Sequence, residues 1–171
     1  NFHARGTSPP RPSFAPLPFD QFTDAVPTSV AVGPDGAYYV AELTGVPFTD
    51  TRANVYRVDP GETARLFLID DACVSGFKAI LDITFDPAGN LYVLQHSTGA
   101  VQLGGPGVLI RVAPSQGEGD VCARYRAGTR TTVLGGLVFP TSVAVGPDGA
   151  LYVTNRGRSI GTGEVLRLEL P

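Results

Sequence analysis

Four polar residues stand where a metal ion or a general base could act: Glu42, Gln95, Asn155 and His96. The first three occupy the same position in three copies of a repeated segment, each directly after a short β-type run. Carboxylate and amide oxygens are the ligands of hard cations, so the three side chains could converge on a calcium ion. The same oxygens could instead bond loop backbone and end their strands. Both interpretations stay open, and no other cofactor is expected.

Nucleophilic or zinc chemistry has little support in the sequence. The histidines are His3 and His96, and the cysteines are Cys73 and Cys122, 49 residues apart. These do not make a tetrahedral zinc set, and a cysteine–histidine pair lacks a local signature. No catalytic or cofactor-binding residue is therefore predicted. A disulfide would suit an exported protein. However, Cys73 follows one predicted fourth strand and Cys122 precedes another, which would place them on opposite faces, so the pairing stays open.

An internal repeat supplies the elements that position these residues. The segments Pro27–Gly36 and Pro140–Gly149 both read PTSVAVGPDG, and Ile80–Val93 reads ILDITFDPAGNLYV with the same pattern. Each copy begins with an alternating, β-branched run that is typical of a half-buried strand. A Pro- and Gly-containing turn follows, and then a second alternating run returns. Each copy is therefore predicted to form a β-hairpin.

Two further strands are predicted in each repeat. Third strands are expected at Asn54–Val58, Val108–Val112 and Glu164–Leu168, and fourth strands at Ala64–Ile69 and Arg130–Leu134. Repeated units of four antiparallel strands are typical of β-propeller blades. The predicted fold class is all-β, with three blades that make half of a six-bladed ring. A Pro-rich extended arm covers residues 1–26, and the blades cover about 27–78, 79–139 and 140–171.

Composition excludes several classes of protein. The 171 residues are 43% hydrophobic and 17% charged, with a net charge of −3, so no basic surface for nucleic acid is expected. No apolar run approaches the ~18 residues of a membrane span. The chain contains no methionine. We therefore expect a processed chain whose leader was removed, located outside the cell or in the periplasm.

An arginine recurs at one position of each third strand, as Arg57, Arg111 and Arg167. The three could form an anion-binding ring, although recurrence at one blade position favours a repeated structural salt bridge. Asp35 and Asp148, in the turns of the first and third copies, are expected to bond the backbone of their own turns.

The runs PTSVAVGPDGAYYVAELTG, NVYRVDPG and PTSVAVGPDGALYVTNRG resemble NHL-repeat propellers of the ScyD/ScyE type. The resemblance covers roughly residues 19–171. It implies a secreted or periplasmic propeller, six-bladed at about twice this length, without a settled catalytic role. Other six-bladed propellers include metal-dependent lactonases.

An arc of three blades would leave two apolar blade faces uncovered. We therefore expect partners: a second copy of the chain, a missing propeller half, or a filament built through the Pro-rich arm. The predicted function is that of an exported structural or binding propeller that self-assembles and engages proteins, in preference to that of an enzyme. The alternative is a metal-dependent lactonase-like hydrolase with its site at the ring centre, held by residues such as Glu42 and Asn155.

Overall fold

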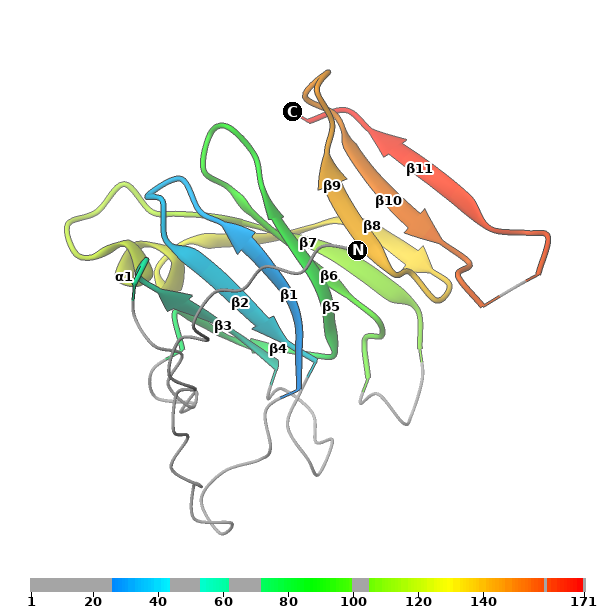
Figure 1. Cartoon of the computed structure of the whole chain (residues 1–171), viewed down its shortest axis with the longest axis horizontal. Helices are drawn as coiled ribbons and strands as arrows, with labels where there is room; N and C mark the ends of the chain where they lie inside the picture. Colours follow the sequence, from blue (N-terminus) through cyan, green and yellow to red (C-terminus); the bar gives the residue numbers. More distant parts are fainter. Residues whose placement is uncertain (1–25, 44–52, 62–71, 100–104, 159, 171) are drawn as a thin grey trace, which may run out of the picture.

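The chain forms three antiparallel sheets that fan out side by side (Figure 1). In this computed structural model the described residues are 26–43, 53–61, 72–99, 105–158 and 160–170. Blade 1 contains β1 (Pro27–Val32), β2 (Tyr38–Glu42), β3 (Ala53–Val58) and β4 (Val74–Phe77). Blade 2 contains β5 (Ile80–Phe85), β6 (Leu91–Gln95), β7 (Gly107–Ala113) and β8 (Thr129–Leu137). Blade 3 contains β9 (Ser142–Val145), β10 (Leu151–Asn155) and β11 (Glu164–Leu168).

The first two strands of each blade form the predicted hairpin. In blade 1 the Gly33 amide donates to the Ala37 carbonyl, and Gly36 takes the positive φ of 79° that its turn requires. Asp35 accepts the Ala37 amide at 3.4 Å, and Asp148 accepts the Ala150 amide at 3.2 Å. The predicted role of both turn aspartates is therefore confirmed.

Strand order confirms the all-β propeller architecture. In all three blades the strands pair in chain order, with four strands in blades 1 and 2 and three in blade 3 among the residues that the structure describes. The first strands β1, β5 and β9 lie next to one another and form the inner edge of the arc (Figure 1). The fourth strand of blade 1 is at Val74–Phe77, whereas the predicted strand at Ala64–Ile69 lies outside the described residues. The predicted arm, residues 1–26, also lies outside them except for Val26.

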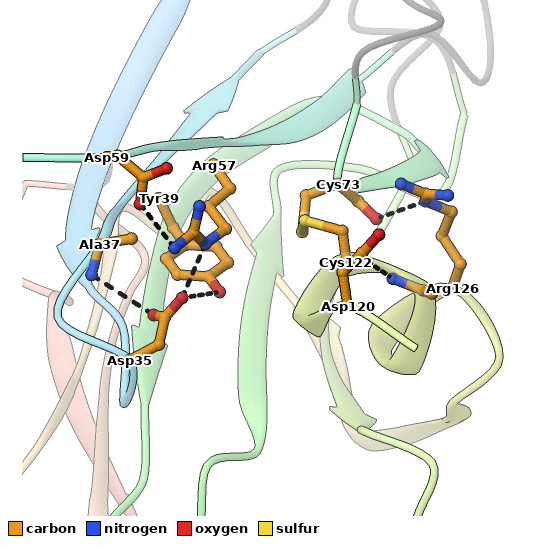
Figure 2. The surroundings of a disulfide bond; sticks show 10 residues. Asp35, Ala37, Tyr39, Arg57, Asp59, Cys73, Asp120, Cys122 and Arg126 are labelled. Carbon is orange, nitrogen blue, oxygen red and sulfur yellow. Dashed lines mark hydrogen bonds and ion pairs between the residues drawn. A yellow bond between two sulfur atoms is a disulfide. The ribbon is translucent and has the colours of Figure 1, made fainter. Parts of the chain in front are cut away.

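One short helix, α1 (Val121–Arg126), interrupts the connection between β7 and β8 and was not predicted. The Asp120 carboxylate caps it by accepting the Ala123 amide at 2.8 Å. Cys122 of α1 is joined to Cys73 by a disulfide, with their Cα atoms 4.7 Å apart (Figure 2). Since β4 begins after Cys73, both cysteines precede a fourth strand and both lie in third-to-fourth connections. The expected opposite-face geometry was wrong because the fourth strand of blade 1 was misplaced.

The core lies between neighbouring blades. We call the side of each blade that carries the positions of Val30 and Val32 its leading face, and the other side its trailing face. The trailing face of blade 1 packs on the leading face of blade 2, where Tyr39 and Phe85 have ring centroids 4.8 Å apart. The trailing face of blade 2 packs in the same way on the leading face of blade 3. Each interior blade therefore needs a neighbour on both sides.

No helix within the described part of the chain is long and apolar enough to cross a membrane.

Candidate functional site

Three polar side chains on the inner strands join the blades near the end where these strands begin. Ser29 of β1, Asp82 of β5 and Ser142 of β9 occupy equivalent repeat positions, and we call them the inner-strand cluster. Ser29 Oγ donates to Asp82 Oδ1 at 2.5 Å, and Ser142 Oγ donates to Asp82 Oδ2 at 2.6 Å. A carboxylate of blade 2 therefore links blades 1 and 3 along the inner edge.

The Asp82 carboxylate also accepts two backbone amides. The Ile83 amide donates to Oδ1 at 2.9 Å, and the Val143 amide donates to Oδ2 at 2.8 Å. An ionised carboxylate has about four acceptor positions, so these four bonds use its capacity. Asp82 therefore positions the two serine hydroxyls, whose own lone pairs can accept hydrogen bonds from a ligand.

The predicted metal ligands lie at this same end but are hydrogen-bonded to other groups of the chain. Gln95 Oε1 accepts the Lys78 amide at 2.9 Å, and Asn155 Oδ1 accepts the Val138 amide at 2.8 Å. The residue after each donor has a positive φ and lies in a tight turn that leads into the next inner strand. Each side-chain amide oxygen therefore stabilises one of these turns. Gln95 Oε1 and Asn155 Oδ1 therefore both bond loop backbone at the ends of their strands.

Glu42, the third of the set, is buried within blade 1. Its Oε1 accepts Asn54 Nδ2 at 2.7 Å and the Tyr56 hydroxyl at 3.0 Å. Burial raises the pKa of Glu42, and the hydrogen bonds from Asn54 and Tyr56 offset only part of that rise. Among the described residues no group of three His, Cys, Asp or Glu side chains could hold a metal ion. The Gln95 and Asn155 oxygens accept backbone amides, and Glu42 Oε1 accepts two side-chain donors. With these oxygens already engaged, the donor set does not fit calcium.

A pocket opens beside this end, in blade 2 and its connection to blade 3. Its volume is about 300 Å³, and it is lined by His96, Gly105, Pro106, Leu137, Val138 and Phe139. We call it the His96 pocket, because the imidazole is the titratable group in that lining. The His96 and Phe139 rings have centroids 5.6 Å apart, and the Arg158 guanidinium lies 4.8 Å from the Phe139 centroid. The His96 imidazole, which can act as a base, and the Arg158 guanidinium, which is a cation, therefore both lie near the apolar Phe139 ring.

The recurring arginines form structural salt bridges in blades 1 and 3. Arg57 Nε lies 2.7 Å from Asp35 Oδ2, and Arg57 also contacts Asp59 (Figure 2). Burial raises the pKa of Asp35, but the Arg57 hydrogen bond and charge outweigh it and leave this pKa below its usual value. Arg167 pairs likewise with Asp148 and Glu169.

Blade 2 departs from this pattern. Ala88 and Ala113 stand where blade 1 has Asp35 and Asp59, and the buried Nε of Arg111 has no hydrogen-bond partner within the part of the chain that the structure describes. The three arginines thus do not form one anion-binding ring.

The sequence prediction missed both the inner-strand cluster and the His96 pocket. Aligned repeats did contain a signal for the cluster, since Asp82 replaces the serine found in the other two copies. The pocket had none, because Phe139 lies 43 residues after His96 and meets it only once blade 2 is folded.

Comparison with known proteins gives three informative similarities. The chain is 26% identical over 152 residues to the Gluconolactonase of Zymomonas mobilis, covering 84% of this chain and 37% of that protein. The structure superposes on an oxidoreductase assigned as glucose dehydrogenase from Thermus thermophilus with a TM-score of 0.56 and 23% identity, covering 83% of this chain and 44% of that one. A second glucose dehydrogenase structure gives a TM-score of 0.54 and 20% identity, covering 85% and 40%. No protein-family model matches the chain.

These similarities correct two predictions. The resemblance to NHL-repeat propellers of the ScyD/ScyE type was wrong, because the similar proteins are a gluconolactonase and glucose dehydrogenases. The PTSVAVGPDG hairpin reflects what a propeller blade requires, an alternating strand and a tight turn, and does not specify that group. The predicted structural or binding function was also wrong, since the curated relative is an enzyme. The chain spans less than half the length of these relatives.

Proposed function

We propose that this chain is a catalytic part of a β-propeller enzyme that hydrolyses a lactone of the sugar-acid type. The observation that carries the proposal is the similarity to a gluconolactonase over 84% of the chain, a span that includes the inner-strand cluster and the His96 pocket. The dehydrogenase structures support only the fold, because their identities are 23% and 20%.

His96 is the group in the pocket that can serve as a general base. The neutral imidazole takes a proton from a water molecule while the water oxygen bonds to the lactone carbonyl carbon. The tetrahedral intermediate then collapses, the ring carbon–oxygen bond breaks, and the imidazolium returns the proton to the departing ring oxygen. One water is consumed, and the product is an open-chain hydroxy acid.

The remaining residues would bind and orient the substrate. Leu137 and Phe139 give the pocket an apolar wall against which the face of a sugar ring can pack. The Arg158 guanidinium, held over Phe139, supplies positive charge near the oxygen that becomes negative in the intermediate. The hydroxyls of Ser29 and Ser142, fixed by Asp82, offer acceptors for substrate hydroxyl groups.

No step is routed through a metal ion, because Glu42, Gln95 and Asn155 do not fit a cation site. Hydrolysis by the chain's own residues needs only the imidazole, water and the surrounding dipoles.

The test is hydrolysis of D-glucono-1,5-lactone, followed as acid release, by wild-type protein, His96→Gln and His3→Gln. His3→Gln is the matched control because it makes the same change at the chain's other histidine. We expect wild type and His3→Gln to exceed spontaneous hydrolysis equally, and His96→Gln to lose about 100-fold or more of the catalysed rate. Equal rates for His96→Gln and wild type would refute the assigned base.

The Cys73–Cys122 disulfide supports a location outside the reducing cytoplasm. We therefore propose a periplasmic or extracellular protein. Fractionation of the source cells with thiol-specific labelling tests this, and a cytoplasmic protein with two free thiols would oppose it.

A further inference from the structure

The leading face of blade 1 exposes apolar side chains that the other blades bury. Val30 and Val32 are each 63% exposed, and Tyr38 is 45% exposed. At the equivalent positions of blade 3, Val143 is 4% exposed and Leu151 is 1% exposed, because the trailing face of blade 2 covers them. The decapeptide that contains the two valines is identical in blades 1 and 3. The exposed face of blade 1 therefore has the chemistry of a surface that this chain already uses to bind a blade.

The trailing face of blade 3 is also uncovered. Val165 is 62% exposed and the Arg167 side chain is 43% exposed. The equivalent residue of blade 1, Val55, is 0% exposed beneath blade 2, and so is Leu109 of blade 2 beneath blade 3. One end of the arc thus carries an uncovered leading face, and the other end carries an uncovered trailing face.

We propose that two copies of this chain associate head to tail, with the leading face of blade 1 in each copy packed on the trailing face of blade 3 in the other. Leading-on-trailing contact is the packing already present twice within the chain, so the new contact continues an established interface. A chain that carries both halves of one interface is complementary to itself. Three blades in each copy close a ring of six, which is within the ordinary range for propellers.

Closing the six-bladed ring would also bring the first strands of all six blades together along one continuous inner edge. Ser142 of one copy comes next to Ser29 of the other, so the inner-strand cluster becomes continuous around the axis and contains two Asp82 carboxylates. A ring of this kind places the polar groups of both copies around one central channel. The association is argued from the exposed faces alone and does not depend on the proposed lactone hydrolysis.

The test is the solution mass of the full chain, by sedimentation equilibrium at micromolar concentration, for wild type, Val30→Asp and Val165→Asp. Ile160→Asp is the matched control, because Ile160 is 102% exposed on a turn outside both faces. We expect wild type and Ile160→Asp at about 36 kDa, twice the 17.9 kDa chain. Each face variant should weaken association roughly 30-fold or more, since a carboxylate would be buried without a partner.

Circular dichroism of the same samples separates loss of association from loss of folding. Dissociated variants with the wild-type β-sheet spectrum support the proposal. Unfolded face variants beside a folded Ile160→Asp support it too, because aspartate at a position 63% or 62% exposed would not unfold an isolated chain. A folded wild-type monomer of 17.9 kDa would overturn it, as would open polymers of no fixed size.

Discussion

Replacing Asp82 by asparagine should reveal how much one carboxylate contributes to holding the three blades together. Asp82 accepts hydrogen bonds at 2.5 and 2.6 Å from Ser29 and Ser142 on the neighbouring blades, and at 2.9 and 2.8 Å from two backbone amides. Asparagine has nearly the same shape but keeps only one acceptor oxygen. Its NH₂ group must therefore face two of the four donors.

The size of the effect follows from the donors that would lose their acceptor. A serine hydroxyl can rotate and accept from the new NH₂ group, but a backbone N–H cannot reverse its role. Depending on which way the asparagine amide points, either the Ile83 amide keeps only its 3.3 Å bond to Ser29 Oγ or the Val143 amide loses its acceptor. The cost is ~1–3 kcal/mol. The other two bonds lose their charge assistance, which adds ~1 kcal/mol. We expect a total loss of about 3 kcal/mol, or roughly 6–12 °C in melting temperature for a chain of this size.

Thermal and urea unfolding of Asp82→Asn and wild type at pH 7 measures this difference. Glu118→Gln is the control, because Glu118 lies exposed in a loop and should change stability by less than about 0.5 kcal/mol. If Asp82→Asn also stays within about 0.5 kcal/mol of wild type, the carboxylate does not hold the blades together and the reasoning is refuted.

Two further predictions concern blade 1 and its covalent link. Because the folded pKa of Glu42 is raised, its proton stabilises the fold below the unfolded pKa of about 4.5, and this contribution is lost as pH rises through the folded pKa. Wild type should therefore lose stability relative to Glu42→Gln as pH rises above about 4.5 in parallel denaturation curves, whereas a constant difference would refute the raised pKa. Removing the Cys73–Cys122 disulfide, which spans 49 residues, should lower the free energy of unfolding by about 4 kcal/mol, because the unfolded chain gains conformational entropy. Melting of Cys73→Ser with Cys122→Ser checks this, and an unchanged transition would contradict it.

The repeats predicted the fold well because each hairpin encodes its own geometry. Alternating β-branched residues fix which side of a strand is buried, and the Gly-Pro-Asp-Gly turn fixes the reversal at Gly36 and Gly149. The fourth strand of blade 1 was misplaced because Ala64–Ile69 is as apolar as a strand, whereas Val74–Phe77 is short and contains Gly76. Because this strand was predicted in the wrong place, Cys73 and Cys122 were also expected on opposite faces.

The functional site was harder to predict, because its residues lie far apart in the sequence and meet only in the folded sheets. The pattern correctly placed Glu42, Gln95 and Asn155 at one end of the sheets, since all three terminate equivalent strands. It could not show that their oxygens accept hydrogen bonds from amides and a hydroxyl of the chain itself. The encounters of Asp82 with Ser29 and Ser142 span 53 and 60 residues, and no local pattern specifies contacts across such distances.

Acid release from D-glucono-1,5-lactone, measured by pH-stat titration on the purified chain, tests the proposed function most directly. Lactone hydrolysis produces one carboxylic acid per turnover, so base consumption counts reaction events without a label. We predict release that is proportional to protein concentration, saturable with lactone and at least about 100-fold lower in His96→Gln. Release equal to the spontaneous rate at every protein concentration, from a correctly folded sample, would show that the chain does not hydrolyse this lactone.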